Sequence, residues 1–374
     1  MQINEKILPP QTIGIIGGGQ LGRMMALAAK YMGYQVVVLD PTENCPTAQV
    51  ADKQITATYD NLQAIRELIA ISDVITYEFE NVSLKTATYI QKEGKLPQGC
   101  RALEVTQNRE LEKRAMEEAN LPVAPYRIVH DEKECGEALQ QLVLPTVMKT
   151  CSGGYDGKGQ LKIETAEQVQ EAMAFVAEKG TCIIEQWVDF DKEISVVFSR
   201  SQSGEIQYFP IAENEHRNHI LYKTTVPAAI SEKVIDKALH AARLLADQLQ
   251  VVGTSAIEMF VKGDNIYLNE MAPRPHNSGH YTIESCNISQ FGQHIRAICN
   301  LPLMKVKQLQ AAVMVNILGQ DLPAALEILQ ANGQASVHIY GKENAKENRK
   351  MGHITYVAET LEEVKAYQLE GMLR

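Results

Sequence analysis

The sequence lacks the features that mark membrane, secreted or nucleic-acid-binding proteins. No stretch of its 374 residues approaches the roughly 18 consecutive apolar residues that suggest a membrane span. The first ten residues contain neither a basic segment nor a long apolar one, so no signal peptide is expected. Acidic side chains exceed basic ones, giving a net charge of −10, which argues against a broad nucleic-acid-binding surface. We therefore expect a cytoplasmic protein with no nucleic-acid or membrane partner.

Cysteine pairs are also lacking. The seven cysteines include no C-x-x-C motif and are scattered through apolar segments. An odd, unclustered set predicts reduced thiols rather than a disulfide framework. The length exceeds the usual size of one hydrophobic core, so we expect two or three domains.

The first hundred residues alternate between strands and helices. Apolar runs predict strands at 12–16, 35–39 and 73–77, with helices over 21–32 and about 61–70 between them. This β–α–β–α–β order predicts a parallel sheet with right-handed crossovers.

Past residue 106 the pattern changes. Charged and amphipathic runs predict helices at 109–120, 234–249 and 322–331. Short apolar runs predict strands at 144–150, from 160, 181–185, 193–200, 205–210, 255–261, 266–270, 312–318, 336–340 and 353–357. Those after 188 are expected to be antiparallel, with a hairpin at Ser203-Gly204. The fold class is therefore α/β at the start and α+β overall.

A glycine-rich turn lies between the first strand and helix. Residues 17–22 (GGGQLG) satisfy the G-x-G-x-x-G pattern, and Asp40 ends the next strand. The usual inference is a dinucleotide site, with phosphate at the helix N-terminus and the acid on a ribose hydroxyl. Such a turn can equally be structural, or can bind another small phosphorylated ligand.

A second glycine-rich segment, KTCSGGYDGKGQ at 149–160, is more specific. Four of its glycines fall within 153–159, and their bare amides can approach a polyphosphate closely. Lys149 and Lys158 add positive charge for phosphate oxygens. No G-K-[ST] follows, so the segment is not a Walker A loop. The alternative is a flexible hairpin tip, which rarely combines so many glycines with two lysines.

Two glutamates bracket a predicted hairpin near the end of the central segment. If its turn is centred on Asp264, Glu258 and Glu270 lie directly opposite on neighbouring strands and share a face. Like charges at that spacing, about 5 Å between Cβ atoms, are destabilising, and a bridging divalent cation relieves the repulsion. A one-residue shift in register would instead place the two side chains on separate faces.

Polar side chains follow this hairpin closely. The segment 269–280 holds Arg274, a fork suited to phosphate or carboxylate, with His276 and His280 as titratable donors. Further positive charge lies in the glycine loop 338–342 and at Arg349. Taken alone, the positive charge in 338–342 and at Arg349 is typical of a solvated surface.

Together these segments resemble the N5-carboxyaminoimidazole ribonucleotide synthetase family of the ATP-grasp superfamily. The matching segments span nearly the whole chain in the family's order and are GGGQLGR (17–23), YEFENV (77–82), KTCSGGYDGKGQ (149–160), EQWV (185–188), NEMAPRPHNSGHYT (269–282) and YGK (340–342). The resemblance implies four domains: a Rossmann-like substrate-binding domain (1–108), an ATP-grasp lid (109–187), an ATP-grasp central domain (188–300) and a C-terminal subdomain (301–374).

The resemblance also implies roles for individual residues. The ATP site would comprise Arg109, Lys149, Gly154, Tyr155, Asp156, Gly157, Lys158, Gly159, Gln160, Glu185, Gln186, Trp187, Val188, Glu193, His216, Asn269 and Glu270. The 5-aminoimidazole ribonucleotide (AIR) site would comprise Gln20, Leu21, Glu78, Arg274, His276, Lys342 and Arg349. Residues expected near the reacting centre are Tyr155, Asp156, Lys149, His276 and Arg274. Glu258 and Glu270 would bind Mg²⁺, or Mn²⁺ in its place.

The activity implied is ATP- and bicarbonate-dependent carboxylation of AIR in purine biosynthesis, through carboxyphosphate, with release of ADP and phosphate. Asp156 or a nearby histidine is the candidate to accept the amine proton. Family members are commonly dimers. Two departures from the family pattern occur: His219 stands before Ile220-Leu221 where relatives have glycine, and Gly292 stands where many have glutamate.

Other functions remain open at this point. The nearest is the formate-dependent glycinamide ribonucleotide transformylase of the same superfamily, which the segments 277–281 and 340–342 fit less well. Function as an NAD-dependent oxidoreductase would explain the glycine turn 17–22 but would leave the glycine-rich segment 153–159 unexplained. A non-catalytic nucleotide sensor does not need a full set of metal and phosphate ligands.

Overall fold

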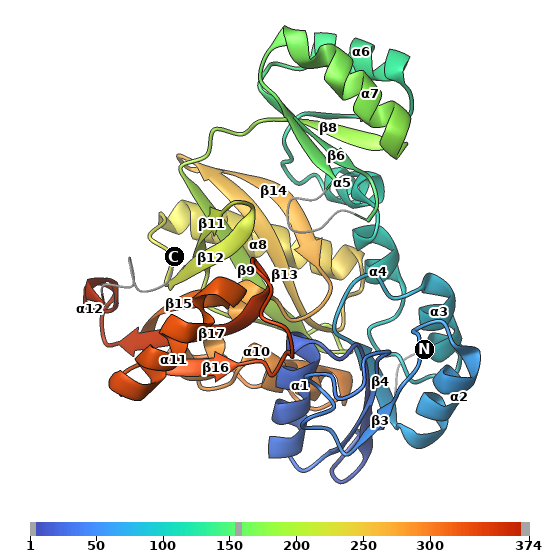
Figure 1. Ribbon diagram of the computed structural model, residues 1–374, viewed down its shortest axis with the longest axis vertical. Coiled ribbons are helices and arrows are strands. Elements are labelled where there is room, and N and C mark those ends of the chain that lie inside the picture. Colours follow the sequence, from blue (N-terminus) through green and yellow to red (C-terminus); the bar gives the residue numbers. More distant parts are fainter. Residues whose placement is uncertain (1–4, 154–158, 368–374) are drawn as a thin grey trace.

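The computed structural model describes residues 5–153 and 159–367. The predicted loop residues Gly154, Tyr155, Asp156, Gly157 and Lys158 lie outside this part of the chain. Within it, the strands form three sheets. None of the helices in these residues combines the length and the hydropathy that a membrane-spanning helix needs. Figure 1 shows the N-terminal sheet below, the lid above, and the central sheet between them.

The N-terminal sheet is parallel, with strand order β3–β2–β1–β4, as the sequence pattern predicts. Its elements are β1 (Thr12–Ile16), α1 (Gln20–Tyr31), β2 (Gln35–Leu39), β3 (Lys53–Ile55), α2 (Leu62–Ile71), β4 (Val74–Tyr77), α3 (Leu84–Lys92) and α4 (Arg101–Thr106). Strands β1, β2 and β4 are near-continuous apolar runs because both faces of the sheet are buried there, whereas the edge strand β3 is short and partly exposed. The glycine turn 17–19 connects β1 to α1 at the carboxyl edge of the sheet.

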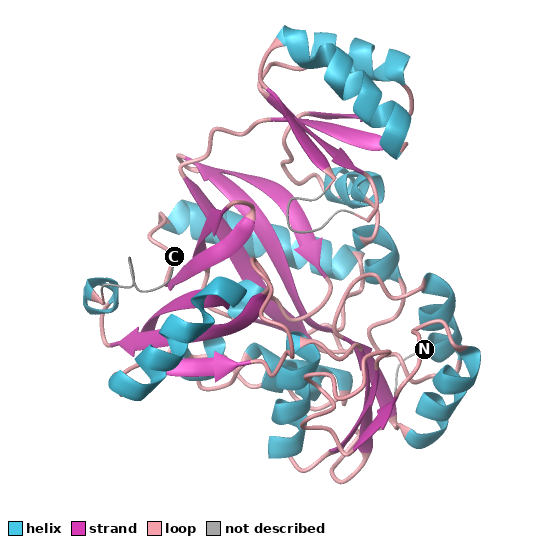
Figure 2. Ribbon diagram, in the orientation of Figure 1, coloured by secondary structure: helices cyan, strands magenta, loops and turns pink. Residues whose placement is uncertain are grey.

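The lid is a four-stranded antiparallel sheet in the order β5–β8–β6–β7. Helix α5 (Arg109–Glu118) leads into it. Its elements are β5 (Tyr126–Val129), α6 (Glu132–Gln141), β6 (Thr146–Thr150), β7 (Gln160–Ile163), η1 (Ala166–Gln168), α7 (Val169–Lys179) and β8 (Cys182–Gln186). Helices α6 and α7 cover one face of the sheet, which leaves the other face toward the central domain (Figure 2).

The central sheet has nine strands in the order β14–β13–β9–β11–β12–β15–β17–β16, with β10 paired to β9. Its strands are β9 (Lys192–Arg200), β10 (Ile206–Tyr208), β11 (Ala212–Arg217), β12 (Ile220–Val226), β13 (Gly253–Lys262), β14 (Asn265–Ala272), β15 (Ala311–Leu318), β16 (Ser336–Ile339) and β17 (Lys350–Ala358). All pairings are antiparallel, as expected after residue 188. The C-terminal strands thus extend the central sheet. The domain boundaries at 108, 187 and 300 stay predictions.

Helices pack on this sheet and join it to the N-terminal part. They are α8 (Glu232–Gln248), η2 (Asn277–Gly279), α9 (Thr282–Ser285), α10 (Gln290–Ile298), η3 (Gly319–Asp321), α11 (Leu322–Ala331) and α12 (Leu361–Ala366). Alanines 238 and 242 of α8 allow close packing on β9 and β13. Phe291 and Ile295 of α10 share one core with Ile13 and Met25, so α10 fixes the N-terminal sheet against the central one.

The hairpin of β13 and β14 places Glu258 opposite Glu270, as predicted, but by a different route. The turn is tighter than expected, with Lys262 paired to Asn265. That register alone would bring Asn269 opposite Glu258. A β-bulge, which shifts the register between Glu258 and Met259, adds one residue to β14 and restores the pairing of the two glutamates.

Candidate active site

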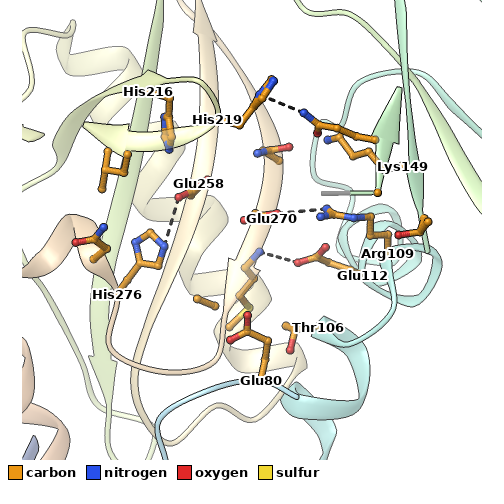
Figure 3. A pocket seen from close by; sticks show the side chains of 18 of the residues that line it. Glu80, Thr106, Arg109, Glu112, Lys149, His216, His219, Glu258, Glu270 and His276 are labelled. Carbon is orange, nitrogen blue, oxygen red and sulfur yellow. Dashed lines mark hydrogen bonds and ion pairs between the residues drawn. The ribbon is translucent and has the colours of Figure 1, made fainter. Parts of the chain in front are cut away.

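One cavity of about 960 Å³ lies between the lid, the central sheet, the N-terminal sheet and the loop before β17. Every site residue that the family resemblance implies within the described part of the chain lines it. These are Gln20, Leu21, Glu78, Arg109, Lys149, Gly159, Gln160, Glu185, Gln186, Trp187, Val188, Glu193, His216, Glu258, Asn269, Glu270, Arg274, His276, Lys342 and Arg349. Figure 3 shows how side chains from several of these elements converge. Their individual roles stay predictions.

Two lysines share one buried carboxylate at the lid end of the cavity. Glu185 on β8 accepts from Lys149 on β6 at 2.7 Å and from Lys113 on α5 at 2.8 Å. Burial by itself would raise the pKa of Glu185, but the two ammonium groups outweigh it and hold that pKa well below the usual range. The side chain of Lys149 is 16% exposed and that of Lys113 only 3%. Lys149 therefore remains accessible to a ligand, whereas Lys113 is structural.

Carboxylates gather on the floor of the cavity, on β13, β14 and α5. Burial and the charge of Glu270 raise the pKa of Glu258 and that of Glu112 to about 8 each. Arg109 donates to Glu270 at 3.2 Å, and Glu112 accepts from the backbone N–H of Met271 at 2.6 Å (Figure 3). One arginine does not neutralise this group, so the floor favours a cation.

Histidines border the same carboxylates. His216 on β11 hydrogen-bonds Glu193 through Nδ1 at 2.9 Å. Burial disfavours protonation of His216, but the bond to Glu193 outweighs it and raises the pKa of His216. His276 Nε2 lies 3.4 Å from Glu258. Burial, with Arg274 nearby, lowers the pKa of His276 to about 3, so its ring is neutral.

The glycine turn is occupied by the protein's own carboxylates. Asp40 accepts from the N–H of Gly18 at 2.7 Å, and Glu78 accepts from those of Gly19 and Gly22. A Cβ on Gly19 would meet Glu78 at 2.6 Å, so the glycines allow the carboxylate to approach. Carboxylates here repel a pyrophosphate and already fill the helix N-terminus. This geometry argues against the dinucleotide reading of G-x-G-x-x-G.

A cationic cluster faces the N-terminal sheet. Arg274 donates to Glu80 at 2.5 Å; burial would raise the pKa of Glu80, but this pair lowers it to about 2. Lys342 and Arg349, in the loop between β16 and β17, donate to backbone carbonyls at 2.7 and 2.8 Å. Lys350 lines the cavity beside them. These side chains bring positive charge to the cavity from the loop that follows β14 and from the loop before β17.

Comparison with known proteins agrees with this arrangement. Residues 10–107 match the ribonucleotide synthetase preATP-grasp domain, residues 114–291 the ATP-grasp domain, and residues 312–367 the phosphoribosylaminoimidazole carboxylase C-terminal domain. The N5-carboxyaminoimidazole ribonucleotide synthase of Bacillus subtilis (strain 168) is 50% identical over 358 residues, covering 96% of this chain and 94% of that protein. The chain belongs to the N5-carboxyaminoimidazole ribonucleotide synthase family.

Solved structures of this synthase family share the fold. An ADP complex of one N5-carboxyaminoimidazole ribonucleotide synthetase superposes with a TM-score of 0.94 at 53% identity, covering 97% of both chains. The synthase of Aspergillus clavatus, in complex with ADP and 5-aminoimidazole ribonucleotide, gives 0.89 at 31% identity, covering 96% of both.

The sequence patterns did not identify several cavity residues, among them Glu80, Glu112 and Lys350, nor Lys113 behind the cavity. Ala115 and Met116 are buried on α5, and helical spacing places Glu112 on their face, which was an available signal. Lys350 directly follows the predicted Arg349. No pattern in the sequence marks Glu80 apart from its place in the segment YEFENV.

One departure from the synthase family's pattern has a backbone consequence. His219 adopts φ +64° in the two-residue turn between β11 and β12, where the family resemblance leads us to expect glycine. Its ring also contacts Gln160 of the lid, at 3.1 Å (Figure 3).

We expect His219→Gly to be more stable than His219→Ala by about 1 kcal/mol, because only glycine adopts this conformation without steric cost. At an ordinary strand position the order is reversed. Urea denaturation of the two variants measures the difference. An alanine variant as stable as the glycine variant would contradict backbone strain at residue 219.

Proposed function

We propose that this chain carboxylates the exocyclic amine of AIR, using ATP and bicarbonate and releasing ADP and phosphate. The observation that carries the proposal is the single cavity with two different ends. Lys149, Glu258 and Glu270 form a nucleotide and metal end. Arg274, Lys342 and Arg349 form a second, cationic group suited to a ribonucleotide 5′-phosphate. Relatives named for this reaction cover nearly the whole chain.

The donor set at the nucleotide end fits Mg²⁺. Glu258 and Glu270 are cross-strand neighbours, and burial together with the charge of Glu270 raises the pKa of Glu258. Two hard oxygen ligands with excess negative charge suit Mg²⁺ beside a polyphosphate. When bound, the ion would neutralise developing charge on the phosphates. The side chains of the cavity would position the reactants and neutralise the rest of the phosphate charge.

Phosphoryl transfer asks mainly for positioning and charge neutralisation. An oxygen of bicarbonate attacks the γ-phosphorus and the bond to ADP breaks, which gives carboxyphosphate. Lys149 and Arg109 would hold the phosphate oxygens during this step. Carboxyphosphate then loses phosphate to leave CO₂, which the amine captures as a carbamate while a base takes the proton. A cavity covered by the lid protects the labile intermediate from water.

ADP release with Mg²⁺-ATP and bicarbonate tests the function. We expect strong stimulation by AIR that depends on bicarbonate. Turnover with formate and glycinamide ribonucleotide in place of AIR would instead support the transformylase of the same superfamily. ATP binding without turnover would support a nucleotide sensor.

Metal binding is expected to release protons. At pH 7 Glu258, with a pKa near 8, is mostly protonated, and an ion favours its deprotonated form. Binding of Mg²⁺-ADP should therefore release up to about one proton, and its affinity should rise with pH and level off above about 8. Calorimetry in buffers of different ionisation enthalpy measures the release. Equal binding heats in all buffers would contradict the raised pKa of Glu258. The Glu258→Gln variant should bind with a heat that does not depend on the buffer.

The resemblance to this family also carries two further predictions, a homodimer and a cytoplasmic location. Light scattering of the purified protein tests the first and cell fractionation tests the second.

A further inference from the structure

A chain of buried hydroxyl and amide groups connects β12 to His276. Thr224 Oγ1 lies 3.0 Å from Asn214 Oδ1, and Asn214 Nδ2 lies 3.0 Å from Ser195 Oγ. Ser195 Oγ lies 2.6 Å from Ser278 Oγ, which lies 2.8 Å from His276 Nδ1. Thr224, Ser195 and Ser278 are fully buried and Asn214 is 5% exposed, so water does not substitute for these bonds.

One backbone contact fixes which group donates and which accepts in each of these hydrogen bonds. The N–H of Ser278 points at His276 Nδ1 from 3.3 Å, and a backbone N–H only donates. Nδ1 therefore carries a lone pair, and in the neutral ring the proton is on Nε2. The Ser278 hydroxyl then donates to Nδ1 and accepts from Ser195.

The more distant members follow the same direction. Because the Ser195 hydroxyl donates to Ser278, it accepts from the Asn214 amide. The Asn214 carbonyl in turn accepts from Thr224. Each of these hydrogen bonds therefore has one fixed donor and one fixed acceptor. This order of donors and acceptors supports one tautomer of His276.

The backbone of His276 is held as firmly as its ring. Gln290 accepts from the His276 N–H at 2.9 Å and donates to its carbonyl at 2.7 Å. With both fixed, Nε2–H points into the cavity toward Glu258, 3.4 Å away (Figure 3). A ring flip would bring Nδ1 into the cavity only by breaking the bond to Ser278.

We propose that Ser278, oriented by Ser195 and Asn214, is a positioning residue that holds His276 as its Nε2–H tautomer, a hydrogen-bond donor rather than a base. Its partner in the reaction, which rests on the proposed function, is an anionic oxygen of bicarbonate or carboxyphosphate. A preorganised donor aimed at such an oxygen stabilises charge as it develops. The proton of the AIR amine goes to a group other than His276.

The tautomer is measured directly, without reference to activity. In protein labelled with ¹⁵N-histidine, two-bond ¹H–¹⁵N correlations distinguish the two neutral tautomers, and His276→Gln assigns the signal. We expect Nε2–H in the ligand-free protein and a shifted or mixed pattern in Ser278→Ala. An Nδ1–H ring in the unmodified protein would overturn the proposal.

Kinetics test the consequence with a matched control on the same strand. Ser195→Ala and Ser199→Ala each remove a buried serine hydroxyl from β9, but the Ser199 hydroxyl hydrogen-bonds Thr254 rather than Ser278, and neither Ser199 nor Thr254 lines the cavity. We expect Ser195→Ala and Ser278→Ala to lower kcat by about 10–100-fold with little change in KM for ATP, and Ser199→Ala to leave kcat unchanged. Equal kcat in all three variants would overturn the proposal. An Nε2–H ring in a protein that does not consume AIR would overturn the proposed function alone.

Discussion

Lys149→Ala is expected to lower turnover by about 10²–10³-fold, the usual cost of removing one preorganised electrostatic donor. Lys149 is the accessible member of the two-lysine group on Glu185, and its ammonium faces the cavity from β6. Because Lys113 still neutralises Glu185 in the variant, the fold should persist. Steady-state ADP release with AIR and bicarbonate measures the loss.

The control for this variant is Lys133→Ala. Lys133 lies on the outer surface of the lid with 84% of its side chain exposed, so its removal should leave turnover unchanged. Circular dichroism of both variants confirms folding. A Lys149→Ala protein with full activity would contradict the placement of the phosphates at this end of the cavity.

Glu185→Gln is expected to lower the free energy of unfolding by about 3–5 kcal/mol, because it leaves the buried ammonium group of Lys113 without its paired carboxylate. Lys113 is almost fully buried, and its other bonds are to the backbone carbonyls of residues 268 and 269, which carry no full charge. The double variant Glu185→Gln/Lys113→Met should recover part of the loss. Urea denaturation measures all of these proteins.

Glu164→Gln provides the comparison. Glu164 pairs with Lys162 at 2.6 Å, as close as the buried pairs, but both side chains are about half exposed. Exposed pairs contribute no more than about 1 kcal/mol, so this substitution should change little. A similar loss in both variants would contradict the importance of burial at Glu185.

The paired glutamates show how far the sequence predicts the site. Alternation and the turn signal are enough to pair 255–261 with 266–270. The bulge that finally brings Glu258 opposite Glu270 depends on how β14 lies along β13, and no local pattern of side chains encodes it. The prediction of opposed glutamates was confirmed, whereas the predicted centre of the turn, Asp264, was wrong by half a residue, because the turn is centred between Gly263 and Asp264.

The glycine turn shows a different limit. G-x-G-x-x-G has the same sequence whether its amides bind a pyrophosphate or a carboxylate. The deciding group is Glu78, on the loop after β4 and far from the turn in sequence. Only the family resemblance, which placed Glu78 beside Gln20 and Leu21, indicated that the turn serves a different ligand from NAD.

Helix α5 shows why buried charges were missed. Its sequence, RELEKRAMEE, is typical of a solvated helix, and charged runs usually lie on the surface. Here α5 packs against β14 and α8, so Glu112 and Lys113 become buried. They are tolerated because Met271, Glu185 and two backbone carbonyls supply partners from other elements. Such partners are brought together only by the tertiary fold.

Oxygen transfer from bicarbonate to phosphate tests the proposed reaction most directly. With ¹⁸O-labelled bicarbonate, ATP and AIR, we expect the released phosphate to gain one bicarbonate oxygen for each AIR carboxylated, because that oxygen becomes the bridge in carboxyphosphate. Mass spectrometry of the phosphate measures it. Carboxylation of AIR with phosphate that carries no label would contradict the carboxyphosphate route, and label transfer to phosphate without any carboxylation of AIR would contradict the assigned substrate.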